Sequence, residues 1–270
     1  MGHTVSAIII EEEVIHYEVL GRGRPLIFVH GWLGSWRYWI PTMQALSSDF
    51  RTYALDLWGF GDSGKRPERY TLDRQAELIH GFMDQLGILK AAFIGHGLGG
   101  LVLIRFVRQY PDWADRLMAV NVPLLGLPDN VRHQLAGTPP ASLVEGFLGR
   151  GPAVDPIKLE AAKTDTAAVA ATVPAASDAG ANLKTEISQL AKACLLVYGE
   201  KDPLVPPPAA DWVSGFTGNV HLVGLEDSRH FPMIDEAPKF NRLLSDFLSL
   251  KAGEDLTNLG LKEEWKRRMR

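Results

Sequence analysis

The hydrophobic pattern of this chain changes period repeatedly, from short apolar runs to longer stretches in which apolar residues recur every three or four positions. The short runs predict strands at Val5–Leu20 (a pair), Leu26–His30, Thr52–Leu57, Ala91–Gly95, Arg116–Val122, Ala193–Tyr198 and Val220–Val223. The helical spacing predicts helices at Trp36–Leu46, Leu72–Leu86, Leu98–Tyr110, Ala209–Phe216 and Pro238–Leu250. Strands and helices that alternate in this way predict an α/β protein with a mostly parallel sheet and helices on both faces.

This alternation stops after Pro123 and resumes near residue 188. Residues 124–187 carry no strong strand signal and are rich in alanine and proline, so we expect short helices there, with breaks at Gly149–Pro152 and Val173–Pro174. We therefore predict a core made of residues 1–123 and 188–270, and a helical cap or lid made of residues 124–187.

The composition is that of an ordinary globular protein, with 46% hydrophobic and 22% charged residues among 270. A net charge of −4 without a basic stripe predicts no nucleic-acid partner. No apolar stretch reaches the length of a membrane span, so no membrane partner is expected. The single cysteine, Cys194, allows no intrachain disulfide and favours a reducing, cytoplasmic location. It lies in an apolar run, where a buried and unreactive thiol is expected.

Two further expectations concern ligands and partners. The sequence has no H-E-x-x-H motif and no Cys/His cluster, so it predicts no metal site. The C-terminal segment Asp255–Arg270 has the length of an amphipathic helix that would pack on a partner or a second copy, so a homodimer is among the expectations.

The most informative stretch is G-H-G-L-G-G at residues 95–100, between a predicted strand and a predicted helix. With serine at its third position, this motif would be a strand-to-helix turn that carries a catalytic nucleophile. The residue there is Gly97, which offers no nucleophile. The same letters satisfy the dinucleotide fingerprint G-x-G-x-x-G, but the next strand ends in Asn121-Val122-Pro123 without the carboxylate that would hold a ribose. No cofactor is therefore expected.

An acid and a base follow this motif in the order that a catalytic triad on this turn requires. Asp202 comes shortly after the strand at Ala193–Tyr198, and His230 precedes the last helix. The chemistry needs this pair because a carboxylate fixes the tautomer of the imidazole and stabilises the imidazolium that forms. The sequence leaves three nearby alternatives for the acid: Glu200, Glu226 and Asp227.

The remaining parts of a catalytic site are expected in two glycine-rich loops. H-G-W-L-G at residues 30–34 follows a predicted strand, and we expect the backbone N–H groups of Trp32 and Leu98 to form an oxyanion hole. Gly31 and His96 lie next to these donors, and we expect them to contact the substrate. The second loop, D-L-W-G-F-G-D-S-G at residues 56–64, is expected to be structural scaffolding near the pocket.

These motifs, together with G-E-K-D-P-L-V-P at 199–206 and S-R-H-F-P at 228–232, resemble those of the α/β-hydrolase fold superfamily, of the esterase and C–C hydrolase type. The resemblance covers most of the chain. It implies the α/β-hydrolase fold and a Ser-His-Asp-type mechanism on a small ester or related carbonyl substrate. Haloalkane dehalogenases and epoxide hydrolases resemble this layout but have Asp at the position of Gly97, which disfavours both activities here.

Gly97 leaves three hypotheses for function. The chain is a hydrolase whose nucleophile has been replaced, which gives an inactive or substrate-trapping form. Alternatively, it is a natural enzyme in which the His230–Asp202 dyad transfers protons without a covalent step. The third hypothesis is a non-catalytic protein that binds a small molecule. Ser35 and Ser63 are candidates for a relocated nucleophile, although neither stands at a strand-to-helix turn and Ser35 has the position of a helix N-cap.

Overall fold

The computed structural model describes residues 6–151, 154–214, 216, 218–251 and 253–259. One eight-stranded sheet runs through it in the order β1-β2-β4-β3-β5-β6-β7-β8. Its strands are β1 (Ser6–Ile10), β2 (Glu13–Gly21), β3 (Arg24–Val29), β4 (Phe50–Leu55), β5 (Ala91–His96), β6 (Ala114–Val120), β7 (Ala193–Gly199) and β8 (Val220–Leu225). The pairs β1–β2 and β2–β4 are antiparallel, and all the other pairs are parallel. This arrangement confirms the predicted fold class.

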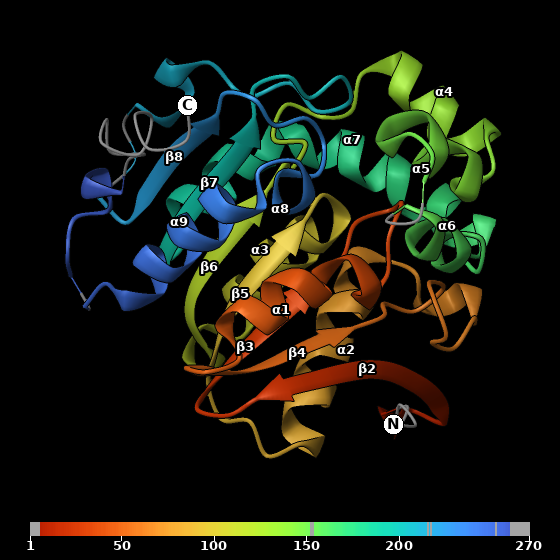
Figure 1. Ribbon diagram of the computed structural model, residues 1–270, viewed down its shortest axis with the longest axis horizontal. Helices are drawn as coiled ribbons and strands as arrows, with labels where there is room; N and C mark the ends of the chain where they lie inside the picture. Colours follow the sequence, from red (N-terminus) through yellow and green to blue (C-terminus); the bar gives the residue numbers. More distant parts are fainter. Residues whose placement is uncertain (1–5, 152–153, 215, 217, 252, 260–270) are drawn as a thin grey trace.

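Helices cover both faces of the sheet (Figure 1). The helices α1 (Ile40–Leu46) and α9 (Ala237–Ser249) pack together in front of the sheet in Figure 1, and α2 (Leu72–Gln85) lies behind it, packed against α3 (Leu98–Gln109). A short helix, α8 (Pro232–Asp235), precedes α9. Thr71 caps α2 and Ser35 caps the 3-10 turn Trp36–Trp39, each by accepting a backbone N–H. The central strands lie between two helical layers, so their side chains are buried on both faces.

Between β6 and β7 the chain inserts four helices, α4 (Asp129–Gly137), α5 (Pro140–Leu148), α6 (Asp155–Ala161) and α7 (Thr166–Ser188), beyond the arrowhead ends of the strands in Figure 1. The predicted break at Val173–Pro174 is absent, because α7 continues through Pro174. Proline removes one backbone donor from a helix, and here the buried side chains of Thr172 and Val173 just before it still pack inward. Near its end, Glu186 pairs with Arg105 and Arg108 of α3, so α7 finishes on the core.

A second difference concerns the stretch Ala209–Phe216, where the spacing predicts a helix. The structure has only a 3-10 turn, Ala210–Val213, in this stretch. The sequence continues with Ser214-Gly215, which are weak helix formers and oppose a longer helix.

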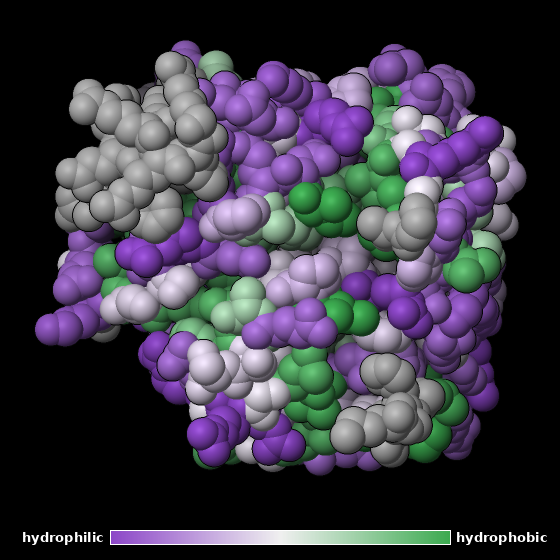
Figure 2. Space-filling view, in the orientation of Figure 1, coloured by the Kyte–Doolittle hydropathy of each residue, from purple (hydrophilic) through white to green (hydrophobic). Residues whose placement is uncertain are grey.

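The described surface is mostly polar. On the face shown in Figure 2, apolar residues form small patches separated by polar ones. Five large apolar side chains of the described residues are exposed: Ile9, Val14, Leu89, Leu125 and Leu159. Ile9 and Val14 are cross-strand partners in β1 and β2. Within the described ranges, no helix is both long enough and apolar enough to cross a membrane. Residues 260–270, which hold most of the expected C-terminal helix, lie outside the described residues.

Cys194 lies inside β7 and is fully buried. Burial raises the pKa of its thiol to about 12, so the reactive thiolate is scarce at neutral pH. We expect iodoacetamide to leave the native protein unmodified for hours and to modify the thiol completely in guanidinium chloride, as measured by mass spectrometry. Rapid modification of the native protein would contradict this assignment.

Candidate active site

The turn between β5 and α3 has the conformation of a nucleophile elbow. Gly97 has φ 51° and ψ −113°, a region that residues with a side chain rarely adopt. Its N–H donates to the carbonyl of Val120 (2.9 Å), and its carbonyl accepts from the N–H of Leu101 (3.2 Å). A Cβ at Gly99 would collide with the carbonyl of Val29, so glycine at this position lets α3 begin close to β3. These contacts fix the turn without any help from a side chain at residue 97.

Gly97 has free space around it. An ideal Cβ on this residue would lie 3.7 Å from Cα of Gly31 and 3.7 Å from Cε3 of Trp32, which are ordinary van der Waals distances. Packing therefore does not require glycine here, and only the positive φ favours it.

His230 and Asp202 form a buried acid–base pair, as the sequence predicts. His230 Nδ1 lies 2.8 Å from Asp202 Oδ2, and the other carboxylate oxygen accepts the N–H of Leu204 at 2.8 Å. The carboxylate holds the imidazole with its proton on Nδ1, which leaves Nε2 as the basic nitrogen. No side chain or backbone group of the described ranges bonds to Nε2.

The alternatives that the sequence leaves open lie elsewhere. The other candidate acids are all exposed: Glu200, Glu226 and Asp227. The two serines are buried, and both hydroxyls have partners. The Ser35 hydroxyl accepts from the N–H of Arg37, and the Ser63 hydroxyl donates to the carbonyl of Asp56 at 2.7 Å. Each serine hydroxyl is therefore hydrogen-bonded within its own loop.

His96 links the base to the predicted oxyanion loop. Burial, together with the charge of nearby His230, lowers the pKa of His96 well below its usual value, so the ring is neutral. Its Nε2–H donates to the carbonyl of His230 (2.8 Å), and its Nδ1 accepts from the hydroxyl of Tyr38 (3.1 Å), which in turn accepts the N–H of Gly31 (2.8 Å). Both ring nitrogens of His96 are thus used inside the protein.

The carbonyl of Gly31 is also used, because it accepts from Nδ1 of His30 at 2.9 Å. The polar groups of Gly31 and His96 are thus hydrogen-bonded within the protein, and the expectation that these two residues contact the substrate stays a prediction. Both act as positioning residues for the loops around the site.

Asn121 is a functional residue that the sequence patterns did not single out. It is fully buried at the end of β6, with φ 45°. Its Nδ2 donates to the carbonyls of Arg229 (3.1 Å) and His230 (3.0 Å), and its Oδ1 accepts the N–H of Gly199 (2.9 Å). The loop that carries the base is thereby tied to the strand that precedes the acid. An asparagine directly after a buried strand is a signal for such a position, because asparagine tolerates a positive φ.

The backbone N–H groups of Trp32 and Leu98 donate to no acceptor within the described ranges. Leu98 is the first residue of α3, so its N–H has no partner inside the helix. The indole Nε1 of Trp32 donates to the hydroxyl of Thr172 in α7 at 2.8 Å. Two unpaired donors are what an oxyanion hole needs, and the assignment of these two residues stays a prediction.

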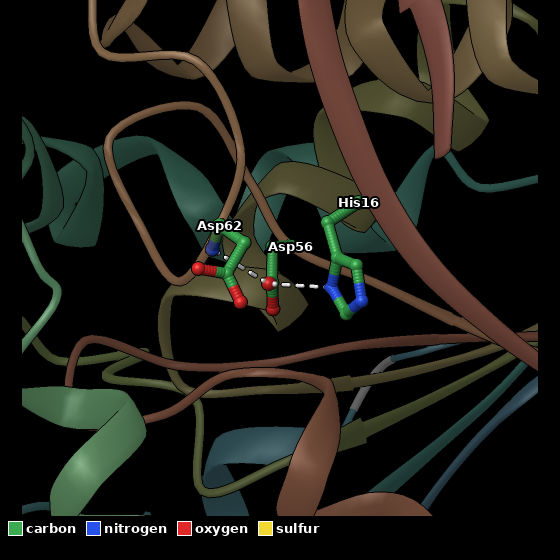
Figure 3. A group of neighbouring side chains, drawn as sticks. All are labelled: His16, Asp56 and Asp62. Atoms are coloured by element: carbon green, nitrogen blue, oxygen red, sulfur yellow. Dashed lines mark hydrogen bonds and ion pairs between the residues drawn. The ribbon is translucent and has the colours of Figure 1, made fainter. Parts of the chain in front are cut away.

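Asp56 organises the loop at residues 56–64 (Figure 3). Its Oδ1 accepts the N–H of Trp36 (2.9 Å), and its Oδ2 accepts from His16 Nδ1 (3.0 Å) and from the N–H of Asp62 (3.1 Å). His16, Asp56 and Asp62 also have the spacing of metal ligands. Hydrogen bonds within the protein account for their arrangement, because both carboxylate oxygens of Asp56 already accept donors.

The His16–Asp56 pair makes stability depend on pH. Burial lowers the pKa of His16, but the hydrogen bond and charge of Asp56, with Asp62 and Glu18, raise this pKa by more, so that it lies above its usual value. The protonated pair therefore stabilises the fold fully below the unfolded pKa of the histidine, and this contribution is lost as the pH rises through the folded pKa.

We expect the stability lost in His16→Asn to shrink by about 1 kcal/mol between about pH 5.5 and about pH 8.5. Urea denaturation at each pH measures the free energy of unfolding of both proteins. His133→Asn, on the exposed surface of α4, is the matched control and should show no such trend. A loss that grows with pH would contradict the expected direction.

A small apolar cavity lies beside the base. It is lined by Trp32, Leu33, Leu127, Val131, Leu135, Leu204, Val205 and His230. Its volume of about 10 Å³ is close to what a single water molecule needs. This cavity is too small to hold a substrate as it stands.

Comparisons with known proteins agree with the observed fold. A family model described as the alpha/beta hydrolase fold matches residues 24–141. The chain is similar to "Putative carbamate hydrolase RutD" of Stutzerimonas stutzeri, with 26% identity over 261 residues, which cover 89% of this chain and 98% of that protein. It is 33% identical over 117 residues to "Bifunctional epoxide hydrolase 2" of Mus musculus, across 41% of this chain but only 21% of the mouse protein.

Among solved structures, a similar one is a serine-to-glycine mutant of the N-acyl homoserine lactonase AidH, complexed with N-hexanoyl homoserine lactone. The two structures share a TM-score of 0.76 at 24% sequence identity, over 91% of this chain and 97% of that one.

Proposed function

Because this chain has the α/β-hydrolase fold and its relatives are hydrolases, we propose that it is a hydrolase in which Gly97 stands in place of the nucleophile, so that it binds a small ester or related carbonyl substrate beside His230 without turning it over covalently. One observation carries the proposal. Gly97 keeps the conformation of a nucleophile elbow and has room for a side chain, while the His230–Asp202 pair remains in place at 2.8 Å. The glycine therefore stands in an otherwise hydrolase-like site.

The chemistry explains why the substrate would remain bound. In a Ser-His-Asp-type mechanism the serine hydroxyl attacks the carbonyl carbon while the histidine takes its proton. Gly97 offers no hydroxyl, so no acyl-enzyme forms and the ester bond stays intact. Removing the nucleophile of a serine protease lowers kcat by about 10⁶. A lactonase with this fold holds an acyl lactone in a form in which a serine is replaced by glycine, which supports the idea that the fold can bind an acyl compound.

A second candidate function rests on the cavity of about 10 Å³ beside His230. A water molecule of that size next to the unpartnered Nε2 could act as the nucleophile directly. His230 would take one proton from the water as the oxygen attacks the carbonyl carbon, and would return that proton to the departing alkoxide. This route is a natural, non-covalent hydrolysis by the His230–Asp202 dyad.

A panel of p-nitrophenyl esters, from acetate to octanoate, tests the two candidates on the native protein, Gly97→Ser and His230→Ala. Turnover that requires the serine variant supports the first candidate. Turnover by the native protein that His230→Ala abolishes would replace it with the second. Silence from all three proteins would overturn both and leave a non-catalytic, small-molecule-binding protein.

A further inference from the structure

We propose that α4 closes an acyl pocket that accepts neutral aliphatic chains, and that Val131 and Leu135 set the longest chain that fits. This inference rests on the proposed function, since it names the substrate class of the same site. It is carried by the side chains that line the cavity and by the way the inserted helices are held to the core.

The side chains that line the cavity disfavour a charged group on the ligand. Seven of its eight lining residues are apolar, and the eighth is the base His230 itself. No lysine or arginine lines it to pair with a carboxylate, and an unpaired buried charge is strongly disfavoured. The part of the substrate that enters here is therefore uncharged and apolar.

The present volume of about 10 Å³ is too small for an acyl chain, so one wall must move. The contacts between the insertion and the core show which wall. Several polar contacts hold α6 and the first half of α7, among them Arg37 with Glu160 (3.5 Å), Lys163 with Asp62 (2.7 Å), Tyr70 with Asp165 (2.6 Å) and Trp32 with Thr172 (2.8 Å).

Among the described residues, no hydrogen bond or ion pair joins α4 to the core. Its side of the cavity consists of Val131 and Leu135, with Leu127 just before the helix. Apolar contacts of this kind can be replaced by a ligand chain without breaking any polar bond. We infer that α4 is the wall that a bound acyl chain displaces, and that its two side chains meet the end of that chain.

Binding to the chain as it is tests the inference without any need for turnover. Isothermal titration calorimetry with methyl esters of unbranched acids, from butanoate to decanoate, should show Kd falling about fourfold per methylene up to a limiting length. Monomethyl adipate, in which a carboxylate replaces the terminal methyl group of methyl hexanoate, should bind at least about tenfold more weakly than methyl hexanoate.

Two variants should change the limiting acyl-chain length in opposite directions. Leu135→Ala removes three carbons from the wall and should extend the limiting length by about two to three methylenes, whereas Val131→Phe should shorten it. Leu159→Ala is the matched control, because Leu159 is an exposed leucine on α6 and lines no part of this cavity. The Kd values of Leu159→Ala should follow the same dependence on chain length as those of the native protein.

The possible results separate this inference from the proposed function. Three results would each overturn the inference. They are a limiting chain length that neither variant changes, tight binding of monomethyl adipate, and no ester binding at all. If the limit moves as expected but Gly97→Ser hydrolyses none of these esters, the pocket is supported and the proposed function fails. If Gly97→Ser is active, but adding Leu135→Ala does not change its preference for acyl-chain length, the inference alone fails.

Discussion

Gly97→Ser should turn this chain into an esterase, with kcat for a short-chain p-nitrophenyl ester about 10³-fold or more above that of the native protein. The space at Gly97 accepts a side chain at van der Waals distance, and the turn already has the elbow conformation. His230 Nε2 is unpartnered among the described residues and can take the proton of the new hydroxyl. A burst of p-nitrophenol equal to the enzyme concentration would show that an acyl-enzyme forms.

The same substitution should lower stability. A residue with a side chain at φ 51° and ψ −113° is strained by about 1–3 kcal/mol, which lowers Tm by several degrees in a chain of this size. Gly97→Ala is the matched control, since it carries the strain without the hydroxyl. Differential scanning calorimetry should show similar losses of Tm in both variants, and only the serine variant should gain activity. Equal activity in the alanine variant would show that the hydroxyl is not the nucleophile.

In the Gly97→Ser background, Asp202→Asn should lower kcat by about 10⁴ while KM changes little. The asparagine keeps the shape of the acid, but it can no longer hold the Nδ1–H tautomer or stabilise the imidazolium of His230. His230→Ala removes the base itself and should be at least as damaging.

Glu200→Gln is the control for the acid, because Glu200 is exposed and only two positions from Asp202. We expect its kcat to stay within about twofold of the parent, as for surface substitutions outside the site. Steady-state kinetics on one ester would measure kcat for both the Glu200→Gln and the Asp202→Asn variants. If Glu200→Gln lost activity and Asp202→Asn did not, the acid would have to be reassigned.

Local patterns were sufficient to predict the fold. Parallel strands buried on both faces are continuous apolar runs, and Thr71 and Ser35 both cap the helices that their positions indicate. The errors have local causes too. Proline and alanine suggested a break in α7, but Thr172 and Val173 keep packing inward and the helix continues through Pro174.

The pairing of Asp202 with His230 was predictable because each follows its own strand in the order that a triad requires. The supporting hydrogen bonds were not, because they join residues far apart in the chain. Tyr38 meets His96 across 58 positions, and Asn121 reaches His230 across 109. No spacing rule connects such pairs, and the burial of His96 becomes evident only once the loops are packed.

The neighbours of Gly97 bear on how readily evolution could place a serine at this position. Glycine and serine codons can differ by a single base, and a Cβ here would meet Gly31 and Trp32 only at ordinary van der Waals distance. A change to serine would therefore need no second, compensating change in the atoms around that Cβ. The backbone strain at residue 97 would oppose this change, so selection for the reaction would have to outweigh a modest loss of thermal stability.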